Sequence, residues 1–193
     1  MYTHRILLLM PLAALSAVVC AQDKIGLGQP VAEADVRAWD IDVRADGRGL
    51  PPGGGNVQSG AKIYREKCAA CHGDRGQGKP MDQLVGAEGT LAGAAPIKTI
   101  GSYWPYATTL YDYIYRAMPF TNPQSLTPDE VYALCAYLLY LNGIVDAAAV
   151  MNAHTLPAVE MPNRRGFVPD PRPDVANAPC RHDCAQMPAS QKQ

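Results

Sequence analysis

The chain has 193 residues and a formal net charge of −1, with 17 Lys and Arg against 18 Asp and Glu. This length suits one ordinary domain with extensions, and no run of Lys or Arg indicates that the chain binds nucleic acid. The informative departures in composition are six cysteines and 17 prolines.

Residues 1–21 have the pattern of an export signal. A positive start and an apolar stretch over 6–19 precede a small-residue cleavage site at Ala21. The apolar stretch is too short for a membrane span. We therefore expect a periplasmic chain that begins at Gln22 after cleavage. Cys20 leaves open a lipoprotein anchor, although the residue before it is a poor match to a lipobox.

Residues 22–55 form the predicted N-terminal arm. Between two glycine clusters, Trp39, Ile41 and Val43 alternate with polar residues, which is compatible with a short strand or with an extended segment. Nothing nearby in the sequence offers a partner strand. We therefore expect an extended arm that lies across the domain that follows.

A helix is predicted after Asn56, a good N-cap residue. Apolar and small residues then recur at helical spacing: Val57, Gly60, Ala61, Tyr64 and Cys68. Glycine lowers helix propensity, so we expect that a second helix crosses closely at Gly60.

The helix leads into the sequence CAACH at residues 68–72. This is C-x-x-C-H, the pattern of covalent c-type haem attachment. Two thiols one turn apart can bond to one edge of the porphyrin, and the adjacent histidine can reach the iron. We expect one haem c, with Cys68 and Cys71 as the thioether links and His72 as an axial iron ligand.

Two alternative interpretations use the same cysteines. They could form half of a zinc site completed by Cys180 and Cys184, or a thioredoxin-like redox pair. The zinc site would need four reduced thiols in an oxidising compartment. The redox pair would need a βαβ pattern, which the surrounding sequence lacks. Haem remains the favoured cofactor.

A polar, glycine-rich loop follows His72 and can wrap tightly around the haem edge. Pro80 could offer its carbonyl to the second nitrogen of His72, or it could only form a turn. Leu84 and Val85 are candidates for packing against haem. Residues 86–101 indicate a further irregular loop.

A second helix is predicted from Pro105, a residue favoured at the first helical position, to Met118. Pro119 disfavours helical geometry at Met118, which places this thioether on a constrained backbone. We expect Met118 to be the sixth iron ligand, since methionine ligation suits electron transfer. Met81 lies too close to His72 in sequence. Four further candidates follow the predicted core: Met151, Met161, His154 and His182.

The best-specified helix begins at Thr127, where a capping box with Glu130 and a proline at the first helical position are predicted. Its apolar stripe comprises Val131, Leu134, Cys135, Leu138 and Leu139. Gly143 ends it. We expect its face to pack on the first helix near Gly60, with Cys135 as a buried thiol.

Residues 144–193 form the predicted proline-rich C-terminal extension. A short helix is expected over 146–153, after which seven prolines exclude long helices. The rest is either a disordered tail or an arm fixed on a surface, and apolar residues such as Met161 favour the arm. Cys180 and Cys184 are expected to form a local disulfide.

The core over 56–143 resembles the class I c-type cytochromes, because it combines C-x-x-C-H, Met118 before a proline and the capped last helix. The resemblance implies an all-α fold around one covalent haem. Four stretches also resemble the cytochrome subunit of sulfane or sulfite dehydrogenases, including those of the Sox system: 100–110, 116–120, 141–143 and 161–164.

This resemblance implies that a molybdenum-cofactor subunit oxidises a sulfur compound and passes electrons to this haem. A downstream cytochrome c or oxidase would then accept them. We expect an electron-transfer subunit without catalytic residues of its own. A free soluble carrier and a haem enzyme, such as a peroxidase or a thiosulfate-oxidising cytochrome, are the alternatives. Removing residues 158–193 is expected to weaken docking to the partner and to leave the haem environment intact.

Overall fold

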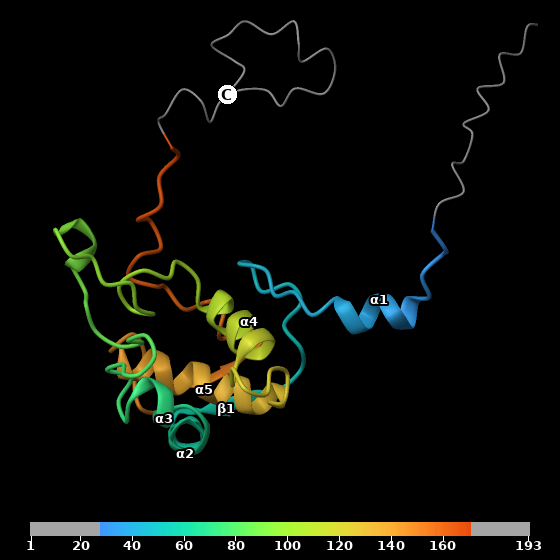
Figure 1. The fold of residues 1–193 in the computed structure, drawn as a ribbon, viewed down its shortest axis with the longest axis horizontal. Coiled ribbons are helices and arrows are strands. Elements are labelled where there is room, and N and C mark those ends of the chain that lie inside the picture. The colour runs from blue at the N-terminus through green and yellow to red at the C-terminus, as the bar shows by residue number, and fades with distance from the viewer. Residues whose placement is uncertain (1–27, 171–193) are drawn as a thin grey trace, which may run out of the picture.

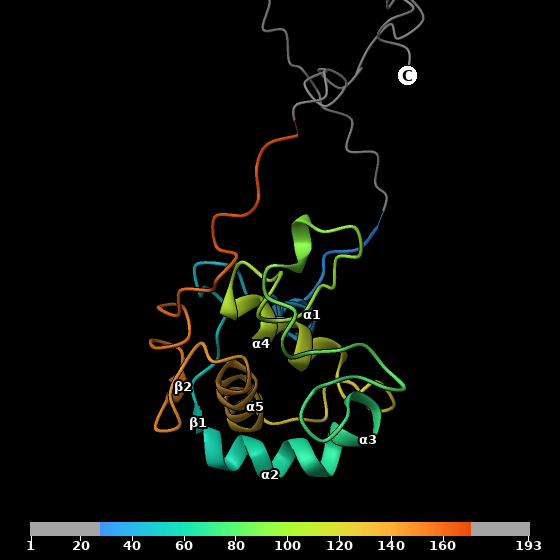
Figure 2. The same ribbon diagram turned by 90° about the vertical axis from the view of Figure 1, so that its left-hand side faces the viewer.

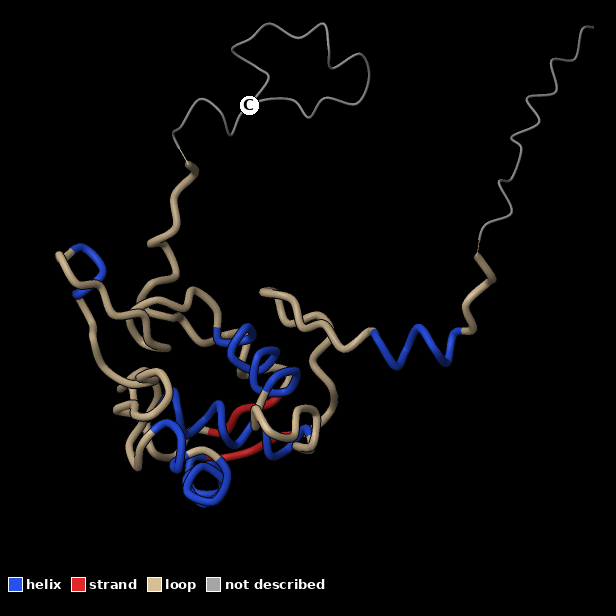
Figure 3. Tube along the Cα trace, viewed as in Figure 1, coloured by secondary structure: helices blue, strands red, loops and turns tan. Residues whose placement is uncertain are grey.

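The computed structural model describes residues 28–170, and its fold is all-α except for two short strands (Figure 3). The predicted export signal, the predicted Cys180–Cys184 pair and His182 lie outside this range. The elements are α1 (Glu33–Trp39), β1 (Gly54–Asn56), α2 (Val57–Lys67), α3 (Ala69–His72), the 3₁₀ turn η1 (Thr90–Ala92), α4 (Ala107–Ala117), α5 (Pro128–Leu141) and β2 (Val150–Asn152).

Helices α2 and α5 pack directly on each other (Figures 1 and 2). A Cβ atom on Gly60 would overlap the carbonyl oxygen of Ala133 and would lie 2.7 Å from Cβ of Tyr137. Only glycine allows this approach, so the close crossing predicted at Gly60 is confirmed. A salt bridge of 2.9 Å between Lys67 Nζ and Glu130 Oε1 also joins the two helices.

The predicted caps of both helices are present. The side chain of Asn56 accepts a 2.9 Å hydrogen bond from the backbone N–H of Ser59. At α5, Thr127 and Glu130 bond reciprocally to each other's backbone N–H, at 3.3 and 2.8 Å. These bonds satisfy N–H groups that lack a partner within the helix, so each helix begins where its cap places it.

Helix α5 is the centre of the hydrophobic core. Residues all around its circumference are buried, as expected of a helix enclosed on several sides. The buried set comprises Val131, Tyr132, Ala133, Leu134, Cys135, Ala136, Leu138 and Leu139. Cys135 is fully buried and unbonded, which confirms the predicted buried thiol. Burial also raises the pKa of this thiol well above its ordinary value.

The helix predicted over 146–153 is wrong, because part of this segment forms β2. Strands β1 and β2 pair antiparallel, with Gly55 opposite Met151. After the strand, Asn152 Oδ1 accepts the backbone N–H groups of His154 and Thr155, at 2.8 and 3.0 Å. These local bonds compete with a helix, and the strand depends on a partner far away in the sequence.

The N-terminal arm combines a helix and an extended segment. The interpretation of Trp39 as part of a strand or extended segment is wrong, since α1 ends there. Glu33 and Asp35 lie in the first turn of α1 and Arg37 in its last, an arrangement that the helix dipole favours.

The part of the arm that follows α1 crosses the domain as predicted. Val43 donates its backbone N–H to Asp112 Oδ1 of α4 at 2.9 Å. The same carboxylate oxygen lies 2.7 Å from Arg116 Nη2, which is also 2.6 Å from Asp42 Oδ1. Farther along, Tyr132 of α5 donates its hydroxyl hydrogen to the carbonyl of Pro51 at 2.8 Å. The segment is therefore fixed to both helices.

The described part of the C-terminal extension is a fixed arm, and it contributes to the core. Leu156 and Met161 are buried, with exposed fractions of 0% and 1%. Asn163 Nδ2 donates to the carbonyl of Tyr103 at 2.7 Å, and the Arg164 guanidinium lies 4.3 Å from the ring centroid of Tyr106. Removal of residues 158–193 would take Met161 out of the core, and the expectation that the haem environment survives this removal stays a prediction.

Helix α4 begins later than predicted, because Tyr106 has extended backbone angles and acts as the N-cap. Pro105 therefore precedes the helix. At the other end, Met118 leaves helical geometry as predicted, with φ −122° and ψ 147°. Among residues 28–170, no helix is both long enough and apolar enough to cross a bilayer.

Candidate haem-binding site

The C-x-x-C-H sequence forms a tight turn at the junction of α2 and α3. Cys68 is the C-cap residue of α2, and its N–H donates to the carbonyl of Tyr64 at 2.9 Å. Its own carbonyl accepts the N–H groups of Cys71 and His72, at 3.1 and 3.0 Å. The two thiols are therefore one turn apart. Both are free, with Cys68 half-buried and Cys71 exposed.

A backbone carbonyl orients the imidazole of His72. Its Nδ1 lies 2.9 Å from the carbonyl oxygen of Asp82. A carbonyl can only accept, so Nδ1 carries the hydrogen and Nε2 is the nitrogen with a free lone pair. Such an outer bond fixes the tautomer of a metal-ligating histidine and raises its basicity. The expectation that the carbonyl of Pro80 bonds to His72 is wrong, because the carbonyl of Asp82 occupies this position. Pro80 instead lies in the turn that leads to Asp82.

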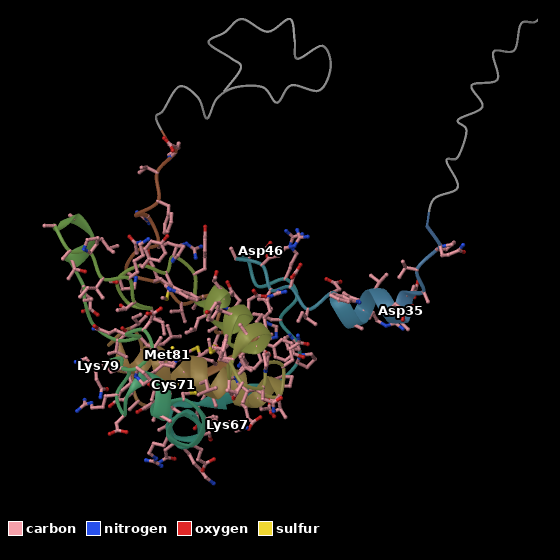
Figure 4. The ribbon with its side chains drawn as sticks, viewed as in Figure 1. Asp35, Asp46, Lys67, Cys71, Lys79 and Met81 are labelled. Atoms are coloured by element: carbon pink, nitrogen blue, oxygen red, sulfur yellow. The ribbon has the colours of Figure 1, made fainter. Side chains whose placement is uncertain are left out.

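The glycine-rich loop folds back on the C-x-x-C-H turn. Gly78 donates its N–H to the carbonyl of His72 at 2.8 Å, and Met81 donates to the carbonyl of Cys71 at 2.9 Å. Figure 4 shows Cys71, Lys79 and Met81 gathered in this region. Met81 is thus held beside Cys71, and 52% of its surface is exposed.

Tyr64, predicted to lie on the packing face of the first helix, and Asn142, at the C-terminus of α5, also hold this loop. Tyr64 donates its hydroxyl hydrogen to the carbonyl of Gly73 at 2.8 Å. Asn142 accepts the N–H of Gly86 at 3.1 Å and donates to the carbonyl of Leu84 at 3.3 Å. A buried tyrosine usually needs a hydrogen-bond partner, so the presence of a tyrosine on the core face could have indicated this role of Tyr64. No feature of the sequence indicates the role of Asn142.

The methionine candidates lie in three environments. Met151 and Met161 are sealed in the core, at 4% and 1% exposure, so their expected place beyond the core is wrong. Met81 is on the open surface beside Cys71, and His154 is exposed. Met118 is half-buried, with its backbone N–H bonded to Ile114 at 3.0 Å.

Half-buried apolar side chains of the C-x-x-C-H turn, of the loop that follows it and of the end of α4 pack against the core: Cys68, Ala69, Leu84 and Met118. Together with two thiols, an imidazole with one free nitrogen and a thioether, this set fits a covalently attached haem, which needs both iron ligands and apolar cover.

The pKa of the Cys68 thiol also bears on the alternatives. Burial raises it to about 11, an effect that neighbouring Lys67 partly offsets. A nucleophilic redox cysteine needs the opposite shift, because the thiolate is the reactive form. Within residues 28–170, no three His, Cys, Asp or Glu side chains come together as a possible metal site.

The chain is similar to several known proteins. The profile of the family described as cytochrome c oxidase, cbb3-type, subunit III, matches residues 55–138. A cytochrome c of Sesamum indicum is 38% identical over an alignment 103 residues long, which covers 46% of this chain and 90% of that protein. A thiosulfate dehydrogenase of Psychrobacter arcticus is 29% identical over 86 residues, or 45% of this chain.

The chain spans only 26% of the length of that thiosulfate dehydrogenase. Among solved structures, the crystal structure of the sulfane dehydrogenase SoxCD from Paracoccus pantotrophus contains a similar chain. The two chains are 43% identical with a TM-score of 0.74, and the likeness covers 83% of this chain and 82% of the other. Residues 56–143 make up a smaller share than this, so the likeness extends into the arms.

Proposed function

Because the chain belongs to the cytochrome c family, we propose that it is the one-haem electron-transfer subunit of a periplasmic sulfane or sulfite dehydrogenase. Family membership implies a covalently bound haem c, and the chain is a c-type electron carrier similar to the cytochrome subunit of SoxCD. The likeness to the sulfane dehydrogenase SoxCD, at 43% identity over most of both chains, carries the proposal.

In this proposal each site residue has a separate role. Cys68 and Cys71 would form the thioether links to the haem, and His72 and Met118 would hold its iron. A bound haem c supplies a one-electron couple. The carbonyl of Asp82 fixes the ring of His72.

The substrate is oxidised elsewhere in this scheme. With His72 and Met118 both holding the iron, the site would leave no place for substrate, which suits electron transfer. The sulfur compound is oxidised at the molybdenum cofactor of a partner subunit. The electrons then pass through this chain to a downstream cytochrome c or oxidase. Export of the chain rests on the signal pattern of residues 1–21.

The test is to mix the purified holoprotein with the molybdenum-cofactor subunit from the same organism, and to follow haem reduction after adding sulfite or a sulfane donor. We expect a stable complex and rapid reduction only when all three components are present. N-terminal sequencing of the native protein should begin at Gln22. Absence of both a complex and haem reduction would reject the proposal and favour a free carrier.

The likeness to a thiosulfate dehydrogenase supports a second candidate, in which the chain oxidises thiosulfate itself. This activity would need an iron position open to substrate. The discriminating measurement adds thiosulfate to the oxidised holoprotein without a partner. We expect no reduction of the haem, and catalytic reduction by thiosulfate alone would favour the second candidate.

A further inference from the structure

Helix α1 projects from the domain and buries none of its residues (Figure 1). Its apolar side chains are instead open to solvent: Trp39 is 86% exposed and Val36 is 51% exposed, while Val31 just before the helix is 67% exposed. Trp39 and Val36 are three residues apart and therefore lie on one face. With Asp35, Asp40 and Val31, they line a shallow, open depression.

The chain directly after α1 is fixed to the domain. The segment that follows α1 is bonded to α4 through Val43 and Asp112 and through Asp42 and Arg116. A helix of seven residues has little stability by itself in water. A short helix held at a fixed point, with a large aromatic side chain directed to solvent, has the features of an anchor for a groove on another protein.

Charge restricts the identity of that protein. Glu33, Asp35 and Asp40 outnumber Arg37 on and beside the helix, and Arg37 already lies 3.3 Å from Glu33. Two copies of such a helix would repel each other if they packed together. The matching surface is therefore an apolar groove with a basic rim, and a second copy of this chain does not offer it through α1.

The location of α1 favours a permanent partner over a transient one. In both ribbon views α1 lies apart from α3, where the C-x-x-C-H turn is found (Figures 1 and 2). A protein bound at α1 would thus leave exposed Cys71 and its surroundings accessible. A transient acceptor uses a small interface near the redox centre, whereas a subunit that stays bound benefits from a separate anchor.

We propose that α1, through Trp39 and Val36, is the element that anchors this chain in an apolar, basic-rimmed groove of the molybdenum-cofactor subunit. This inference rests on the proposed function, since it names the surface through which the two subunits associate. Trp39 carries most of the affinity, because interface energies concentrate in a few aromatic or arginine side chains. The acidic residues accelerate association with the basic rim.

The test compares holoprotein variants in their binding to the purified molybdenum-cofactor subunit. Trp39→Ala should raise Kd by about tenfold or more and Val36→Ala by a smaller factor. Val150→Ala is the matched control, since Val150 is 50% exposed on β2, and its Kd should stay within about twofold of wild type. The haem spectrum and thermal unfolding of all three variants should match wild type, because none of these side chains is buried.

Two further measurements separate the possible outcomes. Trp39 emission should shift to shorter wavelength when the partner is added, with Trp39→Ala as the blank, and should not shift on concentrating the chain alone. Asp35→Asn with Asp40→Asn should slow association at low salt only. If wild type binds the subunit and Trp39→Ala binds it equally well, the role of α1 as anchor is rejected and the proposed function is not affected. Failure of wild type to bind the subunit would reject both.

Discussion

The hydroxyl of Tyr64 donates a 2.8 Å hydrogen bond to the carbonyl oxygen of Gly73, the residue that follows His72. Tyr64 is fully buried, and its ring packs 5.4 Å from that of Tyr137 on α5. Burial raises the pKa of this phenol well above its ordinary value, so the hydroxyl is a hydrogen-bond donor at all physiological pH values. The central helix pair is thereby linked to the peptide beside the proposed iron ligand.

Tyr64→Phe should therefore cost more than the loss of a surface hydroxyl. The substitution keeps the packed ring and leaves the carbonyl of Gly73 with only the N–H of Gly76, at 3.2 Å, which should lower the free energy of unfolding by about 0.5–1.5 kcal/mol. Denaturant unfolding of the holoprotein measures this. Tyr137→Phe is the control, since it changes the other ring of the same pair. Equal stability of Tyr64→Phe and wild type would show that water replaces the bond.

Gly60→Ala tests the crossing of α2 and α5. Alanine has a better helix propensity by about 1 kcal/mol. However, its Cβ would overlap the carbonyl of Ala133, and overpacking costs about 1–3 kcal/mol or more. We expect net destabilisation in thermal unfolding. Gln58→Ala, an exposed change on the same helix, should be neutral or stabilising. A stabilised Gly60→Ala variant would contradict the close crossing.

The capping box predicts a specific dependence of stability on pH. The pKa of Glu130 is lowered, first by the hydrogen bond from the Thr127 backbone and then by Lys67. A carboxyl with a lower pKa in the folded state stabilises the protein fully above its unfolded value, here 4.5, and this contribution is lost as pH falls through the folded value. The free energy of unfolding should therefore decrease below about pH 4.5.

Glu130→Gln isolates this contribution. The variant should be less stable than wild type at pH 7, and the two should converge on acidification, because a protonated carboxyl and an amide are then similar. Glu66→Gln, an exposed change on α2, serves as the control. A difference between wild type and Glu130→Gln that does not change from pH 7 to pH 3 would reject the role of the charge.

The burial of Met161 makes the C-terminal arm part of the domain. Met161→Ala should lower the free energy of unfolding by about 2–5 kcal/mol, as for other large-to-small core substitutions. Met81→Ala should change it by less than about 0.5 kcal/mol, since Met81 is exposed. Removal of residues 158–193 should destabilise the protein at least as much as Met161→Ala. A truncated protein as stable as wild type would contradict the packing.

The features that local chemistry determines could be predicted from sequence. Asn56 and the Thr127–Glu130 box fix where α2 and α5 begin, and glycine at position 60 marks their crossing. The C-x-x-C-H spacing marks the turn between α2 and α3 that is proposed to hold the haem. Each of these depends on residues within one or two turns of each other.

The features that were missed depend on distant or backbone partners. Strand β2 exists because β1 pairs with it, and no local pattern marks that pairing. The carbonyl of Asp82 orients His72, and a carbonyl is present in every residue. Met161 stands alone among prolines, so no periodicity indicates that it is buried. Met118 differs from these cases, because its place after a helix and before a proline could be predicted from neighbouring residues.

The assignment of Met118 as sixth ligand is the prediction on which electron transfer most depends. In the oxidised holoprotein we expect the near-infrared charge-transfer band of methionine-ligated iron, and Met118→Ala should abolish it. The midpoint potential should fall by on the order of 0.1 V, a modest part of the roughly 0.8 V that axial ligands can span. Met81→Ala is the matched control, since it removes a thioether held beside Cys71, and it should keep both the band and the potential. Retention of the band in Met118→Ala would reject the assignment, and its loss in Met81→Ala alone would transfer the role to Met81.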